Sequence, residues 1–227
     1  MRITWFGQSA FLLEGRGADG PLRVITDPYT PELLGYAPIE EGADLVIRSS
    51  KDDQAHCRAD LIGGDPTVVE ALDIALGRAE PPAALPVEAV AAMEWEEHPD
   101  HAPGQNAMYR FELDGIRVAH MGDIGNPLSA GQLDFLRGAD LLLALAGGYL
   151  TVTLDELDRV IRETRPRLVI PMHFRTLTYR PRSTHWIERF LSYHDDERVD
   201  FAFAPSAEIR RDGLPDHTRV LVLDYLR

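Results

Sequence analysis

Short apolar runs separated by turn residues dominate the first third of the chain. Their spacing predicts strands over residues 2–6, 10–14, 22–26, 44–48 and 65–69. The run at 44–48 is almost continuously apolar, which is typical of a strand buried on both faces. Residues 71–76 fit either a strand or a short helix, and the prolines that follow predict a loop.

The rest of the chain alternates predicted strands with predicted helices. Asp114-Gly115 joins 108–113 to 116–120 in a predicted hairpin, and further strands are expected at 140–146, 168–172, 199–203 and 219–223. Helices are expected after Ser129, from the capping pair Thr153 and Glu156 to Pro166, and over 183–193. Strands with interleaved helices and hairpins predict an α/β layered sandwich, here as one domain over residues 1–227.

The charge and cysteine content of the sequence limit the partners and the compartment expected for this domain. The formal net charge is -14 at pH 7, so the surface repels phosphate backbones and anionic membranes. We therefore expect a small-molecule substrate rather than nucleic acid or a membrane. Cys57 is the one cysteine, which excludes an intrachain disulfide, and no apolar run approaches the roughly 20 residues of a membrane span. These features favour the cytoplasm.

Ligand-type residues follow three of the predicted strands. His56 comes a few residues after 44–48, Asp123 follows 116–120, and His173 follows 168–172. A rigid strand can direct the side chain at its carboxyl end into a shared cleft. The three residues are therefore candidates for one site.

Four ordered segments carry a family resemblance. Residues 3–10 (ITWFGQSA), 25–29 (ITDPY), 118–123 (VAHMGD) and 170–174 (IPMHF) occur in the order and spacing of the metallo-β-lactamase superfamily. The chain resembles the branch with the ascorbate-6-phosphate lactonase-like proteins and related zinc-dependent hydrolases. This resemblance implies a four-layer αββα sandwich with a metal site at one edge of its two sheets.

The resemblance also implies a set of metal ligands, and the central loop departs from it. The family loop reads Ser/Thr-His-x-His-x-Asp-His, which places Lys51 and Asp53 at the first two histidines, Ala55 at the aspartate and His56 at the last histidine.

The remaining family positions lie outside this loop. The third histidine matches His98, with His101 as the alternative. The bridging carboxylate matches Asp123, the final histidine matches His173, and Asp27 matches an aspartate that orients a ligand.

These departures leave one metal position nearly intact. His56, Asp123 and His173 form a workable set for one divalent ion, zinc or another, with His98 nearby. A protonated lysine cannot coordinate a metal, so Lys51 removes a ligand from the other position. One hypothesis is that the Lys51 ammonium replaces that ion by bridging Asp53 and Asp123. The alternative is that Lys51 points to solvent.

Two functions follow from this reading. The first is a hydrolase with at most one metal ion, which activates water for attack on a lactone, ester or phosphodiester, with Asp123 as metal ligand and Asp53 as general base. The second is a metal-free pseudo-enzyme that acts as a ligand-binding or protein-interaction module. Relatives of this branch are often oligomeric, so a homo-oligomer is a further expectation.

Overall fold

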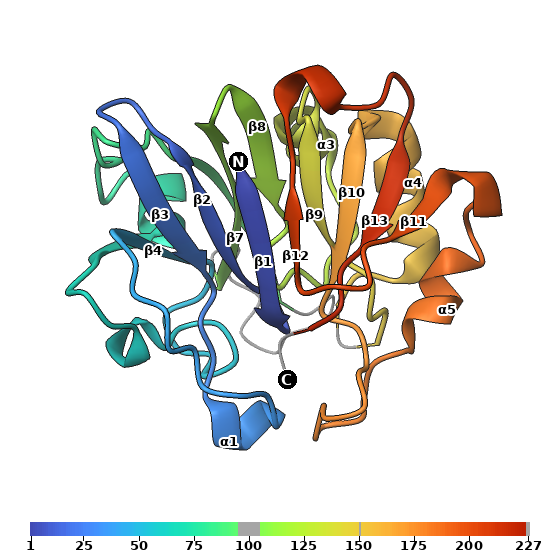
Figure 1. The fold of residues 1–227 in the computed structure, drawn as a ribbon, viewed down its shortest axis with the longest axis horizontal. Coiled ribbons are helices and arrows are strands. Elements are labelled where there is room, and N and C mark those ends of the chain that lie inside the picture. The colour runs from blue at the N-terminus through green and yellow to red at the C-terminus, as the bar shows by residue number, and fades with distance from the viewer. Residues whose placement is uncertain (95–104, 150, 226–227) are drawn as a thin grey trace.

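Two β-sheets form the framework of the protein (Figure 1). The computed structural model describes residues 1–94, 105–149 and 151–225. One sheet has the order β12-β1-β2-β3-β4-β5, with strands Ser206–Glu208, Arg2–Gly7, Ala10–Arg16, Pro21–Thr26, Leu45–Arg48 and Thr67–Glu70. The other has the order β11-β13-β10-β9-β8-β7-β6, with strands Val199–Phe201, Arg219–Val222, Leu168–Met172, Leu141–Leu145, Ile116–His120, Asn106–Leu113 and Glu88–Ala92.

Hydrophobic patterning explains the centre of the seven-stranded sheet. Strands β8, β9 and β10 pair in parallel, and every residue of β9 and β10 is buried. Continuous apolar runs are required there, because both faces of a central parallel strand are covered. The predicted hairpin is confirmed, with Asp114 and Gly115 at positive φ between β7 and β8.

Within the described residues, five α-helices accompany the sheets, spanning Pro31–Leu34 (α1), Ala71–Ala75 (α2), Ala130–Leu136 (α3), Leu154–Thr164 (α4) and Ile187–Leu191 (α5). Helix α4 contacts α3. Its apolar stripe, Leu157, Val160 and Ile161, is buried. The α/β sandwich predicted from the sequence is confirmed.

Some elements differ from the prediction. Strands β6 and β12 were not predicted, and the ambiguous segment 71–76 is mainly helix α2. The helix expected at 183–193 is confined to Ile187–Leu191. In the described part of the chain, no helix has the length and apolar character needed to cross a membrane.

Loops at the carboxyl ends of strands from both sheets meet at one edge of the sandwich. His173, just after β10, donates its main-chain N–H to the Gln8 carbonyl, which follows β1. The imidazole of His120, at the end of β8, contacts the carbonyl of Ser9 at 3.1 Å. These contacts tie the two sheets together at the place where the candidate site lies.

Gly122 occupies a position in this edge that no side chain can share. Its φ is +63°, and an added Cβ would lie 2.4 Å from Asn106 Oδ1 and 2.5 Å from the Ala107 carbonyl oxygen. We expect Gly122→Ala to lower the free energy of unfolding by about 2–5 kcal/mol, from left-handed backbone strain and overpacking. Urea unfolding followed by circular dichroism measures the change.

Gly131→Ala is the matched control. Gly131 lies in α3, and its added Cβ would meet nothing within 4 Å. This variant should be neutral or stabilised by up to about 1 kcal/mol, because alanine favours helix. Equal stability of Gly122→Ala and wild type would contradict the close contacts at this edge.

Candidate metal centre

A fully buried carboxylate, Asp27, organises the candidate site. Asp27 follows β3 with a φ of 38° and accepts hydrogen bonds from the main-chain N–H of Ser49 at 2.7 Å and from Ser49 Oγ at 2.6 Å. Its carboxylate also contacts His56 Nδ1 at 3.0 Å and accepts a longer hydrogen bond from the Tyr109 hydroxyl at 3.5 Å. Burial alone would raise the pKa of Asp27, but His120, His56 and Ser49 outweigh it and hold the pKa below its usual value. Asp27 is therefore an ionised anchor.

The bond to Asp27 fixes the orientation of the His56 ring. Nε2 then faces Asp123 Oδ2 at 3.4 Å and Asp53 Oδ2 at 3.8 Å, and it is buried with no hydrogen-bond partner. Burial opposes protonation, but the carboxylates of Asp123, Asp27 and Asp53 raise the pKa of His56 to about 10. The metal-free site therefore holds a proton where a cation would fit.

Asp123 and His173 complete this face of the site. The main-chain N–H of Asp123 donates to Asn106 Oδ1 at 3.0 Å, and Asp123 Oδ1 lies 3.2 Å from His173 Nε2. His173 has a φ of 58°, and burial lowers its pKa. Its ring is nearly parallel to that of His56, with centroids 5.7 Å apart. A neutral His173 is in the form that binds metal ions.

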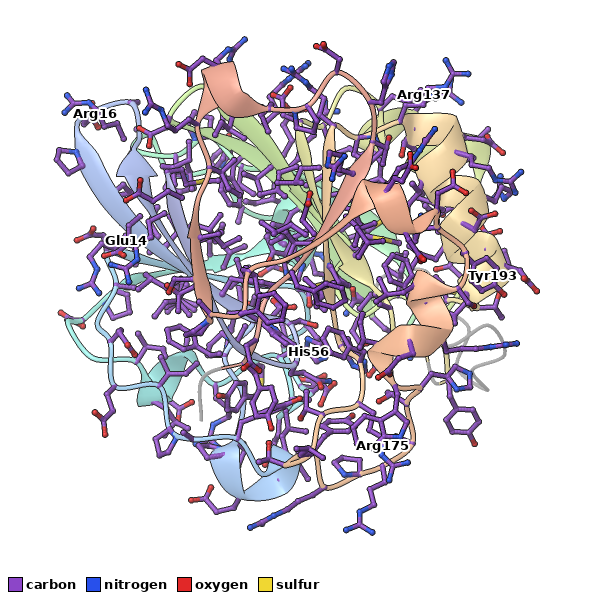
Figure 2. The ribbon with its side chains drawn as sticks, turned by 45° about the vertical axis from the view of Figure 1, so that its right-hand side comes forward. Glu14, Arg16, His56, Arg137, Arg175 and Tyr193 are labelled. Carbon is purple, nitrogen blue, oxygen red and sulfur yellow. The ribbon has the colours of Figure 1, made fainter. Side chains whose placement is uncertain are left out.

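The donor atoms of His56, Asp123 and His173 fit a divalent cation. All of them lie within 4.8 Å of one another, and all three residues are buried. His56 Nε2 and Asp123 Oδ1 have no hydrogen-bond partner, so a cation would satisfy buried polar atoms. Figure 2 shows His56 within the body of the protein, whereas Tyr193 and Arg137 lie at its surface. Two imidazoles and a carboxylate suit zinc and related ions.

Lys51 does not bridge the acids of the site. Its Nζ donates to Asp73 Oδ2 at 2.7 Å, and its side chain is 41% exposed. Asp73 lies in the first turn of α2, and this pairing turns the lysine away from Asp53 and Asp123. The sequence-based hypothesis that Lys51 replaces a metal ion is therefore not supported by the geometry.

The other predicted residues have different outcomes. Asp53 lies at the site, where Oδ1 accepts the N–H of Ala55 at 2.8 Å and Oδ2 faces His56. His98 and its alternative, His101, lie outside the described residues.

Sequence reasoning missed Glu94, which follows β6. Its carboxylate forms a second group with those of Asp53 and Asp123, and the three donor atoms lie within 4.8 Å of one another. Burial, followed by repulsion from Asp123 and Asp53, raises the pKa of Glu94 to about 8. Prediction of strand β6 would have placed Glu94 just beyond a strand end, which is the signal that identified Asp123 and His173.

His120 contacts the turn that carries Asp123. Its Nδ1 accepts the N–H of Gly122 at 2.9 Å, and its ring stacks on Tyr109 with centroids 4.7 Å apart. Burial lowers the pKa of His120. The neutral ring thereby positions the turn that carries Asp123.

Known proteins share this fold and this family. Residues 2–173 match the family model of the beta-lactamase superfamily domain. A UPF0173 metal-dependent hydrolase of Archaeoglobus fulgidus is 26% identical over 208 residues, covering 78% of this chain and 84% of that protein.

Solved structures agree with this assignment at the level of the fold. A metallo-β-lactamase superfamily structure from Thermotoga maritima has a TM-score of 0.74 and 24% identity, with 99% of each chain covered. An isothiocyanate hydrolase from Delia radicum gut bacteria has a TM-score of 0.62 and 12% identity, with 97% of this chain and 96% of that chain covered. Because the family model spans most of the sequence, the chain belongs to the beta-lactamase superfamily and has the fold of its metal-dependent hydrolases.

Proposed function

We propose that the protein hydrolyses a small molecule by means of a divalent ion, zinc foremost, held by His56, Asp123 and His173. The observation that carries this proposal is the group of buried donor atoms, two of which lack hydrogen-bond partners. When bound there, such an ion supplies Lewis acidity and a water of lowered pKa. The bonds attacked would be those of a lactone, an ester or a phosphodiester.

The side chains of the protein have separate roles in this proposal. Asp27 holds His56 with Nε2 toward the site, and Asn106 holds the main chain of Asp123. Asp53 is 25% exposed and faces His56, so its carboxylate can accept a proton from the attacking water. The acidic surface, with its net charge of -14, favours small substrates over nucleic acid.

Metal content and hydrolysis test this proposal together. Protein purified without chelator should contain zinc, manganese or iron, and should hydrolyse a member of a panel of lactones, nitrophenyl esters and bis-nitrophenyl phosphate. His173→Ala removes one of the three donors, so we expect loss of the histidine-bound metal and of chelator-sensitive hydrolysis. Elemental analysis and the panel measure both.

His217→Ala is the control, because His217 is exposed and belongs to neither group of donors. It should keep both metal and activity. Wild-type protein that binds no metal even after soaking would overturn the proposal. That result would favour the metal-free binding module, for which the replacement of loop ligands by Lys51 and Ala55 is the supporting feature.

Asp27 provides a second test, through the orientation of His56. Asp27→Asn keeps the shape of the side chain but removes the charge that holds Ser49 and the His56 ring. We expect zinc affinity to fall by about 10–100-fold, the usual effect of losing a carboxylate that supports a ligand histidine. Competition with a fluorescent zinc chelator measures this change.

Asp140→Asn provides the comparison for Asp27→Asn. Asp140 is also a buried carboxylate, but its bonds are to the N–H and side chain of Arg117, away from the site. This variant should lose stability while zinc affinity stays unchanged. Equal zinc affinities in both variants would show that Asp27 has no part in binding metal.

A further inference from the structure

A cavity of about 590 Å³ lies at the edge of the sandwich opposite the candidate metal centre. Its walls come from the end of α4, the residues that precede β10 and β13, and the segment between α5 and β11. Arg167 directly precedes β10 and His173 directly follows it, so a rise of about 3.3 Å per residue places the two positions about 20 Å apart. Tyr193, which lines the cavity, lies at the surface and apart from His56 in Figure 2. The cavity is therefore separate from the metal centre.

Basic side chains predominate in this cavity, although the chain as a whole is acidic. The lining has four arginines against three aspartates, and His194 and His217 add two imidazoles, whereas the chain carries a formal net charge of -14. Three arginines form ion pairs with the three aspartates, at 2.9, 3.6 and 3.9 Å: Arg162 with Asp158, Arg198 with Asp195, and Arg167 with Asp216. The excess positive charge is therefore that of the fourth arginine, Arg165.

Arg165 is held in a backbone conformation that arginine rarely adopts. It caps the carboxyl end of α4 with φ 52° and ψ 55°, and its main-chain N–H donates to the Ile161 carbonyl at 2.9 Å. Glycine is the usual residue in this position, because a Cβ strains the left-handed region. Within residues 1–94, 105–149 and 151–225, the Arg165 guanidinium forms no ion pair and no hydrogen bond. A strained residue that carries an unpaired charge into a cavity is typical of a ligand site.

His194 adds a second polar group without a partner. Its Nε2 is shielded from solvent and makes no hydrogen bond to any residue that the structure describes. The ring packs edge-on against Phe190 with centroids 4.7 Å apart, which fixes its position in the cavity wall. Buried polar atoms are normally hydrogen-bonded, so a polar ligand in the cavity would satisfy this one.

We propose that this cavity binds a small oxyanion, namely a phosphate group that is either free or carried by a small organic molecule, through Arg165 and His194. This inference does not rest on the proposed function, since none of the described candidate metal ligands lines the cavity. A guanidinium matches two oxygens of one phosphate at once. The volume lies within the range of small-molecule sites, about 300–1,000 Å³, so an organic group has room beside Pro166 and the Tyr193 ring.

Nuclear magnetic resonance titration of the full-length protein with inorganic phosphate tests this proposal. The ¹⁵N–¹H signal of the Arg165 Nε reports contact with phosphate directly and without reference to activity. In wild type, the Arg165 and His194 signals should shift and saturate, and sodium chloride at matched ionic strength should not reproduce the shifts. Glycerol phosphate distinguishes the two sources of the ligand. Tighter binding than that of inorganic phosphate identifies an organic phosphate, and weaker binding identifies the free ion.

Two variants separate phosphate binding from stability. Glycine suits the left-handed cap, so Arg165→Gly should melt at or above the temperature of wild type. It should nevertheless bind phosphate at least about tenfold more weakly, because it loses a charge-assisted pair of hydrogen bonds. His194→Phe keeps the ring packed against Phe190 and removes Nε2, so binding should weaken by about 2–10-fold.

Arg182→Gly is the matched control, since Arg182 is also exposed, has a φ of 55° and lies outside the cavity. Its phosphate affinity should equal that of wild type. The proposal is overturned if Arg165→Gly binds phosphate as tightly as Arg182→Gly does. Shifts of the same size in wild type with chloride as with phosphate would overturn it as well, because they would show general screening of charge rather than a site.

Discussion

The hydrogen bonds around Asp27 are the interaction on which the site depends. This buried carboxylate joins the end of β3 to Ser49 after β4, and it fixes the ring of His56 further along the same loop. A buried charge is costly unless its hydrogen bonds are satisfied, and Asp27 has its oxygens directed at these donors. The hydrogen bonds that stabilise the loop therefore also fix which nitrogen of His56 faces the candidate site.

Backbone strain gathers at the same edge of the sandwich. Gln8, Asp27 and His173 have positive φ without being glycine, and Gly122 has a φ of 63°. Each lies within a few residues of a strand end, where the chain turns sharply at the candidate site. Such conformations persist only where surrounding contacts determine them, here the bonds from His173 to Gln8 and from Gly122 to His120. The rigid strands supply that support.

The sequence correctly predicted the features that depend on local hydrophobic periodicity and on position at the end of a strand. The buried runs β9 and β10 and the Asp-Gly hairpin are visible in the sequence, and so are Asp123 and His173 at the ends of strands. Strand β6 was not predicted because Glu-Ala-Val-Ala-Ala has little of the β-branched and aromatic character of strands. Glu94 was missed with it. The ion pair between Lys51 and Asp73 could not be predicted from the sequence either, because Asp73 approaches Lys51 only through packing of α2 beside β4.

The two groups of donor atoms, which share Asp123, are held in place by different contacts. His56 is held by Asp27 through Nδ1 and by the Asp53 carbonyl through its main-chain N–H, and His173 is held through Gln8. Asp53 stands where the family resemblance implies a histidine, and Glu94 brings a further carboxylate from the opposite sheet. Asp123, whose main chain is held by Asn106, belongs to both groups of donor atoms. A shift of the turn that carries Asp123 would therefore alter both groups.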